Sequence, residues 1–446
     1  MRITMCPEAV LGVCIYAAAC AAVAQPESNR DNQPERLEWL QDAGFGLFVH
    51  WSVDSQVGSV ISHSLVGASA EYTDWYYNEL PKSFTARRWA PDELAELAKL
   101  AGAKYVVFTT KHHNGFCMWD TKTTPYNIMN TPCHRDLVRD YVDAIRRQGL
   151  GVGIYYSPED FHWMHENGFE ARRKNLPFDP DTHPPFVKLL EDQTRELFTN
   201  YGPIDVLFID GEGAEPVKRV AWQLQPDCLI TRGAIPTPEQ FIPGDAPEGP
   251  WESCFTMGTQ WQYKPTHEDY KSGTRVIEML IETRAKGGAL LLNLGPKPDG
   301  QLPIEQESRL REIALWMAVN NQAIYNTRPW ATTREGDVWF TKSKDGGTVF
   351  AFLTKQSDWP RGERREFLLR SVQATAETTV RVLGQSDQVV EYMPDVDAQS
   401  RFEQTPEGLS VSIVRAQRLY NDHRWPNPIV LEVSAVQTPD SGGDPR

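Results

Sequence analysis

The spacing of apolar and polar residues changes once along the chain, near residue 326. From about residue 35 to 325, short β-branched or aromatic runs alternate with longer segments of helical period. The expected strands are Phe45–His50, Tyr105–Thr110, Val152–Tyr156, Val206–Asp210, Leu229–Arg232 and Ala289–Asn293, and the expected helices are Pro91–Ala101, Arg135–Gln148, Pro185–Tyr201 and Thr274–Lys286. Apolar strands that alternate with amphipathic helices predict a parallel sheet covered by helices. The length of this region favours an α/β fold of the (β/α)8 barrel type.

After Pro329 the pattern becomes typical of an all-β domain. Short strand-like runs are separated by turn residues such as Asp345-Gly346-Gly347, which predicts a β-sandwich. The runs are Val338–Thr341, Thr348–Leu353, Glu366–Arg370, Thr378–Leu383, Val389–Met393, Leu409–Val414 and Ile429–Val433. We therefore expect a catalytic barrel over residues 35–328, a sandwich over 329–436 and a disordered tail over 437–446.

The amino-terminal residues resemble an export signal. Arg2 precedes an apolar run of small residues over 9–24, and Ala22-Val23-Ala24 is typical of a cleavage site. We predict a signal peptide over 1–24, a linker over 25–34, and a periplasmic or extracellular protein. A lipoprotein-type site at Cys20 is a weaker alternative. The run is too short to span a bilayer, so no membrane span is expected.

Composition narrows the class of partner. Asp and Glu number 60 against 45 Lys and Arg, a formal net charge of −15, which repels nucleic acid. An aromatic content of 11%, including 14 Trp, excludes a disordered chain and suits a protein that stacks on sugars. Four cysteines follow the predicted signal peptide, and we expect buried free thiols rather than disulfides or a zinc site. They are Cys117, Cys133, Cys228 and Cys254.

The expected barrel strands end in residues that a plain core would exclude. Their carboxyl ends carry His50-Trp51, Lys111-His112-His113, Tyr155-Tyr156, Asp210, Arg232 and Asn293. In a parallel barrel these ends meet at one rim, where such folds carry their chemistry. Adjacent His112 and His113 point to opposite sides of an extended chain, so we expect no metal and no cofactor.

Asp210 is the strongest candidate for a catalytic group. It ends a wholly apolar run and is flanked by glycine, and a charge buried there is costly unless it is paired or used. Glycoside hydrolysis would require a second carboxyl group. Glu252, Glu248 and Glu212 are the candidates, and we favour Glu252, because a neighbouring Trp251 in a partly dry loop would raise its pKa.

Five motifs, in order, resemble the α-L-fucosidases of glycoside hydrolase family 29. They are Phe45–Trp51, Ala101–Val107 followed by Lys111–Phe116, Gly153–Pro158, Asp205–Gly211 and Leu291–Pro296. The resemblance implies a retaining exo-glycosidase on a (β/α)8-like barrel followed by a β-sandwich, without a metal. Its substrate would be a fucosylated oligosaccharide or polysaccharide.

Position by position, the resemblance makes Asp210 the nucleophile. It makes Glu252 the acid/base, through the run Trp251–Cys254 followed by Trp261–Tyr263. The sugar contacts that it implies are His50, His112, His113, Tyr156 and Arg232, with Glu71-Tyr72 preferred over Asp74-Trp75 for a further contact. Trp51 or Trp251 would stack on the sugar.

Two positions depart from the family pattern. Ser52 stands where the family commonly has Gly, and Asn114 where it has Asp. These departures leave open a related sugar, such as α-L-galactose or sulfated fucose. A non-catalytic fucose-binding protein and a metal hydrolase are further alternatives.

Overall fold

The structure is a computed structural model that describes residues 31–356, 358–417 and 427–437. The predicted signal peptide, most of the predicted linker and residues 438–446 of the predicted tail lie outside these ranges. Within them, no helix is long and apolar enough to cross a membrane.

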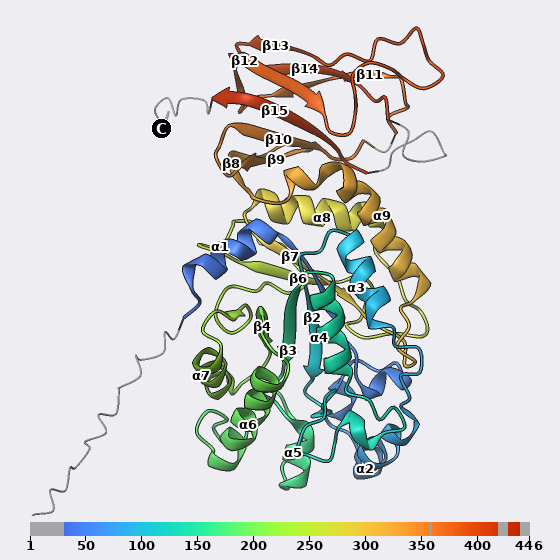
Figure 1. Cartoon of the computed structure of the whole chain (residues 1–446), viewed down its shortest axis with the longest axis vertical. Coiled ribbons are helices and arrows are strands. Elements are labelled where there is room, and N and C mark those ends of the chain that lie inside the picture. Colours follow the sequence, from blue (N-terminus) through green and yellow to red (C-terminus); the bar gives the residue numbers. More distant parts are fainter. Residues whose placement is uncertain (1–30, 357, 418–426, 438–446) are drawn as a thin grey trace, which may run out of the picture.

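The first domain is built on a parallel sheet in barrel order (Figure 1). Its strands are β1 (Phe45–Val49), β2 (Tyr105–Lys111), β3 (Gly151–Tyr156), β4 (Val206–Ile209), β5 (Leu229–Ile230), β6 (Glu252–Thr256) and β7 (Ala289–Leu294). The spatial order is β5-β4-β3-β2-β1-β7-β6, and every pairing is parallel. The two edge strands, β5 and β6, are consecutive in the chain, as they are around a barrel. The predicted (β/α)8-like arrangement is thus confirmed.

A proline-rich segment, residues 231–251, fills the seam between β5 and β6. It runs beside β6, where the backbone amides of Glu252 and Cys254 donate to the carbonyls of Pro236 and Pro238 at 3.1 and 3.0 Å. Prolines have no amide hydrogen, so this segment forms one isolated bridge, Glu239 with Cys254, instead of a regular strand. The barrel therefore closes through an irregular segment.

Helices surround the sheet. They are α1 (Pro34–Ala43), α2 (Ala70–Asn78), α3 (Pro91–Leu100), α4 (Leu137–Arg147), α5 (Phe161–Glu166), α6 (Pro184–Asn200), α7 (Ala214–Leu224), α8 (Gly273–Ala285) and α9 (Ile304–Asn320). Two of them, α2 and α5, lie beyond the carboxyl-terminal ends of the strands (Figure 1). Pro91 and Pro184 occupy first-turn positions, where a missing amide hydrogen costs nothing. Asp136 caps α4 by accepting from the amide of Arg139 at 2.8 Å.

Alternate side chains of the strands form two separate cores. Phe48, Tyr105, Tyr155, Phe208 and Leu291 belong to a cluster inside the barrel. The residues beside them in sequence point outward and pack under the helices. This alternation decides which strand-end residues face the site.

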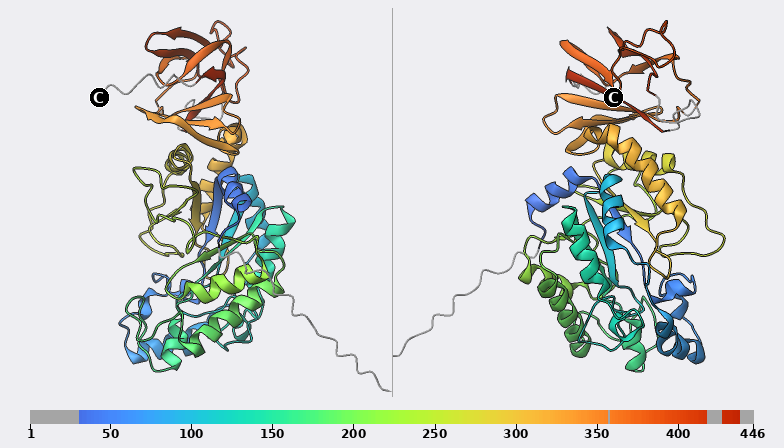
Figure 2. Two further views of the ribbon diagram at one scale, coloured as in Figure 1. Left: turned by 90° about the vertical axis from the view of Figure 1, so that its left-hand side faces the viewer. Right: turned by 45° about the vertical axis from the view of Figure 1, so that its right-hand side comes forward.

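The second domain consists of antiparallel strands in two sheets, as predicted. They are β8 (Thr327–Glu335), β9 (Val338–Ser343), β10 (Thr348–Leu353), β11 (Arg364–Leu369), β12 (Gln373–Val382), β13 (Arg401–Thr405), β14 (Gly408–Val414) and β15 (Ile429–Gln437). The sheet orders are β12-β15-β10-β9-β8 and β11-β14-β13. The domain packs near α8 and α9, at the end of the barrel away from α2 and α5 (Figures 1 and 2).

Some expected elements differ from those observed. Residues 389–393 form turns rather than a strand, with Val390 packed in a small cluster beside Met393. Strand β6 was not expected, because its residues follow the proline-rich segment and include polar Glu252 and Ser253. Cys117, Cys133, Cys228 and Cys254 are buried, and their thiols are free.

Candidate active site

Polar side chains gather at the carboxyl-terminal rim of the barrel. His50 follows β1, His112 and His113 follow β2, Asp210 follows β4, and Arg232 lies just after β5. The His50 and His112 rings lie 5.8 Å apart, and the His112 and His113 rings 4.1 Å apart. The structure thus brings together five of the residues expected from the sequence, because parallel strands end at one rim.

Asp210 is the centre of this cluster. The Tyr155 hydroxyl donates to its Oδ2 at 2.9 Å, and Arg232 and Arg173 approach its Oδ1 at 3.2 and 3.5 Å. Burial by itself raises the pKa of Asp210, but Arg232 and Arg173 outweigh burial and hold that pKa below its usual value. Asp210 is therefore an ionised carboxylate at neutral pH, as a nucleophile must be.

Each of the three site histidines is hydrogen-bonded at Nδ1 to a neutral side chain, which leaves Nε2 for a ligand; His113 Nδ1 also lies 3.3 Å from Glu159 Oε2. Burial lowers the pKa of His50 to about 3 and lowers those of His112 and His113 well below their usual range, so all three are neutral. Neutral imidazoles exchange hydrogen bonds with hydroxyl groups. The Nδ1 partners are Asn293 Oδ1 for His50 (2.6 Å), Ser62 Oγ for His112 (2.7 Å) and Ser157 Oγ for His113 (2.6 Å).

Trp261 supplies an aromatic surface beside His50. Its ring lies 4.9 Å from the His50 ring and 6.1 Å from that of Phe48, and the residue is half-buried. Its carbonyl accepts from Asn293 Nδ2 at 2.5 Å, which ties it to the strand-end residues. The run Trp261–Tyr263 was noted in the sequence, but no role was assigned to Trp261.

The two tryptophans expected to stack on sugar lie elsewhere. Trp51 is fully buried against Phe84 and Trp89, with ring centroids 5.5 and 5.1 Å away. Trp251 precedes β6 and its Nε1 donates to the carbonyl of Lys286 at 3.3 Å. Both belong to the packing of the barrel, so neither offers a face to a ligand.

Strand alternation also corrects the expected tyrosine. Tyr156 points outward, where its hydroxyl donates to Gln193 Oε1 at 2.7 Å and accepts from Lys111 Nζ at 3.3 Å. Tyr155, one residue earlier, points inward to Asp210. The tyrosine of the site is therefore Tyr155.

Near α2, the side chain that lies closest to the rim histidines is His63, not the expected pair Glu71-Tyr72. Glu71 is exposed, and the Tyr72 hydroxyl donates to Ser64 Oγ at 2.9 Å. The exposed ring of His63 lies 5.8 Å from the His113 ring and 6.5 Å from the His112 ring. Neither Glu71 nor Tyr72 contacts the rim histidines within the described residues, so His63 is the nearer group.

Glu252 does not lie beside Asp210. It is the first residue of β6 and pairs with Ala289, the first residue of β7, at the amino-terminal end of the sheet. Its carboxylate accepts a hydrogen bond from Tyr105, the first residue of β2. Burial does raise the pKa of Glu252 to about 7, as expected, but the group faces the barrel interior. The sequence-based assignment of Glu252 as acid/base is therefore corrected.

A partly exposed carboxyl group that the structure brings near Asp210 is that of Glu239. One nitrogen, Arg232 Nη1, lies 3.2 Å from Asp210 Oδ1 and 2.9 Å from Glu239 Oε2. The two oxygens are thus at most about 6 Å apart, close to the spacing of about 5–5.5 Å that retaining glycosidases use. Glu239 lies in the seam segment, and its side chain is 42% exposed, which suits exchange with water.

The two alternative acids are less well placed. Glu248 is exposed at the far end of the seam segment. Glu212 is exposed and only its backbone amide approaches the site, 3.4 Å from Glu159 Oε1. Glu239 was not among the acids considered from the sequence; the available signal was that it is the first acid after Arg232, in a segment rich in proline.

The two departures from the family pattern contact each other. Asn114 Nδ2 donates to Ser52 Oγ at 2.9 Å and to the Tyr76 hydroxyl at 3.0 Å. The amide of Asn114 donates to Ser62 Oγ at 2.9 Å, and Ser62 in turn holds His112. Ser52 and Asn114 therefore form one buried unit behind a site histidine.

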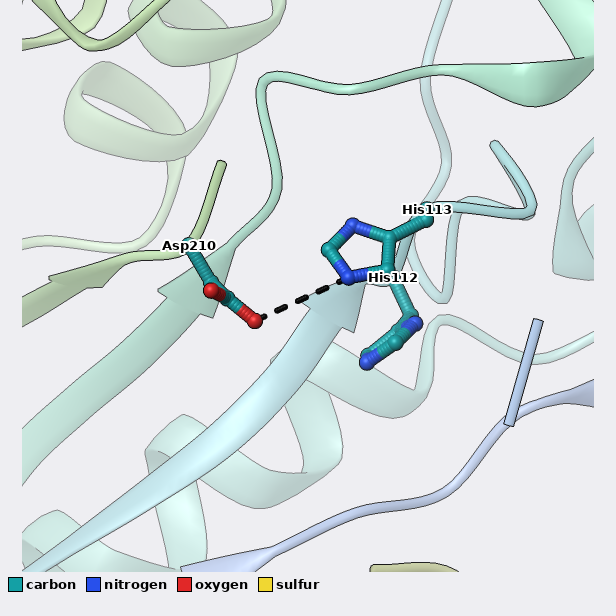
Figure 3. A group of neighbouring side chains, drawn as sticks. All are labelled: His112, His113 and Asp210. Atoms are coloured by element: carbon teal, nitrogen blue, oxygen red, sulfur yellow. Dashed lines mark ion pairs between the residues drawn. The ribbon is translucent and has the colours of Figure 1, made fainter. Parts of the chain in front are cut away.

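Three of the site residues could in principle hold a cation. Each of His112, His113 and Asp210 offers a ligand atom, and these atoms lie within 4.8 Å of one another; His113 Nε2 is 3.7 Å from Asp210 Oδ2 (Figure 3). Two guanidinium groups, from Arg173 and Arg232, already share the carboxylate. Their positive charge opposes a metal ion at this position.

A glycoside hydrolase uses two carboxyl groups together with side chains that bind sugar hydroxyls. One rim of the barrel presents an ionised carboxylate, a second carboxyl group that shares Arg232 with it, and neutral histidine rings. A sequence model of the α-L-fucosidase family matches residues 15–322. The chain belongs to this family, glycoside hydrolase family 29, and is an α-L-fucosidase that hydrolyses fucosyl residues.

Individual relatives agree with this assignment. The tissue α-L-fucosidase of Bos taurus is 31% identical over 396 residues, which cover 78% of this chain and 80% of the relative. An α-L-fucosidase isoenzyme from Paenibacillus thiaminolyticus superposes with a TM-score of 0.74 at 27% identity, covering 90% of this chain and 99% of its own. The Thermotoga maritima α-fucosidase in complex with fucose gives 0.67 at 28% identity, covering 89% and 96%.

Proposed function

We propose that the protein is a retaining, exo-acting α-L-fucosidase in which Asp210 is the nucleophile and Glu239 the acid/base. The observation that carries the proposal is the single guanidinium nitrogen of Arg232 that bridges the two carboxylates. This contact keeps one oxygen of each carboxylate within about 6 Å of the other, which allows the spacing that a double displacement requires.

In the first step, Asp210 attacks the anomeric carbon while Glu239 gives its proton to the departing glycosidic oxygen. In the second step, Glu239 removes a proton from water, and the water oxygen displaces Asp210 from the anomeric carbon. Arg232 contacts both groups, and Tyr155 fixes the other oxygen of Asp210. These fixed donors require little rearrangement as charge moves during the reaction.

The exo mode of attack follows from the depth of the site. His50, His112 and His113 are 3%, 4% and 0% exposed and rest on the barrel core. A site closed at its inner end admits the terminal sugar of a chain. We propose fucosylated oligosaccharides or polysaccharides as substrates, supported by the fucose complex of the Thermotoga maritima relative.

An activated 2-fluoro-fucosyl fluoride tests this mechanism. Peptide mass spectrometry of the treated protein should find the sugar on Asp210. The Asp210→Ala variant should lose turnover of an aryl α-L-fucoside by at least about 10³-fold with unchanged circular dichroism. Labelling of another residue, or inversion in the first product seen by NMR, would reject the proposal.

We also propose that the protein is exported through its first 24 residues. The apolar run over 9–24 and the Ala22–Ala24 motif support this. Amino-terminal sequencing of the secreted protein should start at Gln25, whereas an intact amino terminus would argue against it.

A further inference from the structure

A second buried carboxyl group, Glu159, adjoins the nucleophile but has no role in the reaction described above. It is 1% exposed and follows β3 in the chain. Its Oε2 lies 2.9 Å from Arg173 Nε and 3.3 Å from His113 Nδ1. Both of these residues also approach Asp210, at 3.5 and 3.7 Å. Glu159 thus contacts two of the groups that surround the nucleophile.

The backbone beside the nucleophile is shaped to admit Glu159. Gly211, next to Asp210, has a φ of +128°, and a Cβ atom there would lie 2.8 Å from Glu159 Cγ. The backbone amide of Glu212 lies 3.4 Å from Glu159 Oε1. A larger residue at 211 would displace the Glu159 carboxylate, so the glycine preserves this contact.

Arg173 is paired with Glu159 through its Nε. It lies in the segment between α5 and α6, and its side chain is 35% exposed. A long side chain on such a segment keeps one geometry only when a partner holds it. Glu159 is buried and accepts from Nε, which directs Nη2 to Asp210 Oδ1. Arg232 approaches the same oxygen from β5.

We propose that Glu159 is a positioning residue that holds Arg173 on Asp210, and that Arg173 accelerates the second step of the reaction. This inference rests on the proposed function. In that step a water oxygen bonds to the anomeric carbon, the bond from that carbon to Asp210 breaks, and its electron pair returns to the carboxylate. The water proton goes to Glu239. A guanidinium group beside Asp210 stabilises the carboxylate as it leaves.

The two steps of the reaction differ in how much they need Arg173. In the first step the carboxylate gives up its negative charge, so a neighbouring cation does not assist it. In the second step the charge reappears, and the cation lowers the barrier. The catalytic efficiency, kcat/KM, reports the first step, whereas kcat reports the second step once that step becomes the slower one, as we expect in a variant that lacks Arg173.

The test uses 4-nitrophenyl α-L-fucoside with the full chain and the variants Arg173→Gln and Glu159→Gln. We expect kcat and KM to fall together by about tenfold, kcat/KM to stay within about twofold, and a burst of one nitrophenol per protein to appear. Arg173→Lys should restore part of kcat. The matched control is Arg172→Gln, whose native side chain pairs with exposed Glu170 and should leave all constants unchanged.

Other outcomes separate this inference from the proposed function. A fall in kcat/KM without a burst, or unchanged constants in both variants, would overturn the role of Glu159 and Arg173 while Asp210→Ala stays inactive. A double variant whose loss equals the product of the two single losses would also overturn it, because residues that act through one contact are not additive. Turnover that survives Asp210→Ala would instead refute the proposed function.

Discussion

Tyr105 donates a hydrogen bond to Glu252 inside the barrel, at the end remote from Asp210. The contact is possible because Gly46 lies beside Tyr105, where a Cβ atom would be 2.4 Å from the Tyr105 ring. The glutamate that the sequence motif suggested as a catalyst is thereby part of the buried core. Its raised pKa has a consequence for folding rather than for catalysis.

Glu252→Gln should stabilise the protein at alkaline pH. Burial raises the pKa of Glu252 from 4.5 to about 7, so the folded state binds its proton more tightly than the unfolded state. The contribution of Glu252 to native stability is therefore lost as the pH rises from about 4.5 to 7, by roughly 3 kcal/mol at most. Urea unfolding at pH 5 and pH 8 should show the variant gaining on the native protein only at pH 8.

The enzymatic activity of Glu252→Gln tests whether Glu252 takes part in catalysis. Glu252→Gln should hydrolyse an aryl fucoside at close to the native rate, since its carboxyl group does not reach Asp210. Glu248→Gln serves as the exposed control from the same region. A loss of activity in Glu252→Gln that external azide restores would return Glu252 to the role of acid/base.

Glu239→Ala should lose more activity on substrates whose leaving group needs a proton in order to depart. General acid catalysis contributes about 10²–10⁴-fold, so substrates with poor leaving groups should lose most and activated aryl fucosides least. Azide should restore turnover and give a fucosyl azide, because a small anion replaces the base-activated water. Product analysis by NMR identifies it. Equal losses for all substrates, with no azide product, would exclude Glu239.

The adjacent tyrosines should separate function from stability. Tyr155→Phe removes the donor to Asp210 and should lower kcat by about tenfold, the effect of a loss near 1.4 kcal/mol in the transition state. Tyr156→Phe removes a buried bond to Gln193 and should cost about 1 kcal/mol of stability with little change in kcat. Kinetics and chemical unfolding of both variants provide the comparison. The reverse pattern would show that Tyr156 faces the sugar.

Ser52 and Asn114 should behave as one unit. In a double-mutant cycle of Ser52→Ala and Asn114→Ala, we expect a coupling free energy of about 1 kcal/mol in unfolding. Both single variants should raise KM, because Asn114 reaches His112 through Ser62. Additive effects on stability would show that their 2.9 Å contact contributes nothing.

The sequence alone determined the parts of this protein that follow from chain periodicity. Parallel strands separated by helices must end at one rim, so residues after the strands, such as His50, His112 and Asp210, could be placed together without coordinates. Asp210 was identifiable because burying a charge at the end of an apolar strand is costly unless the charge is paired or takes part in the reaction. The all-β second domain also followed from short, turn-separated runs.

Only the tertiary structure decided which carboxyl group lies near Asp210, which tyrosine faces it and which tryptophan lies beside His50. Glu239 reaches Arg232 because the irregular segment between them folds back against β6, and the path of an irregular segment, unlike strand periodicity, leaves no regular pattern in the sequence. Tyr155 and Tyr156 differ by one position, which reverses the face on which a side chain lies. Trp51, Trp251 and Trp261 are the same residue type, so only tertiary packing distinguishes the two buried rings from the half-buried ring beside His50.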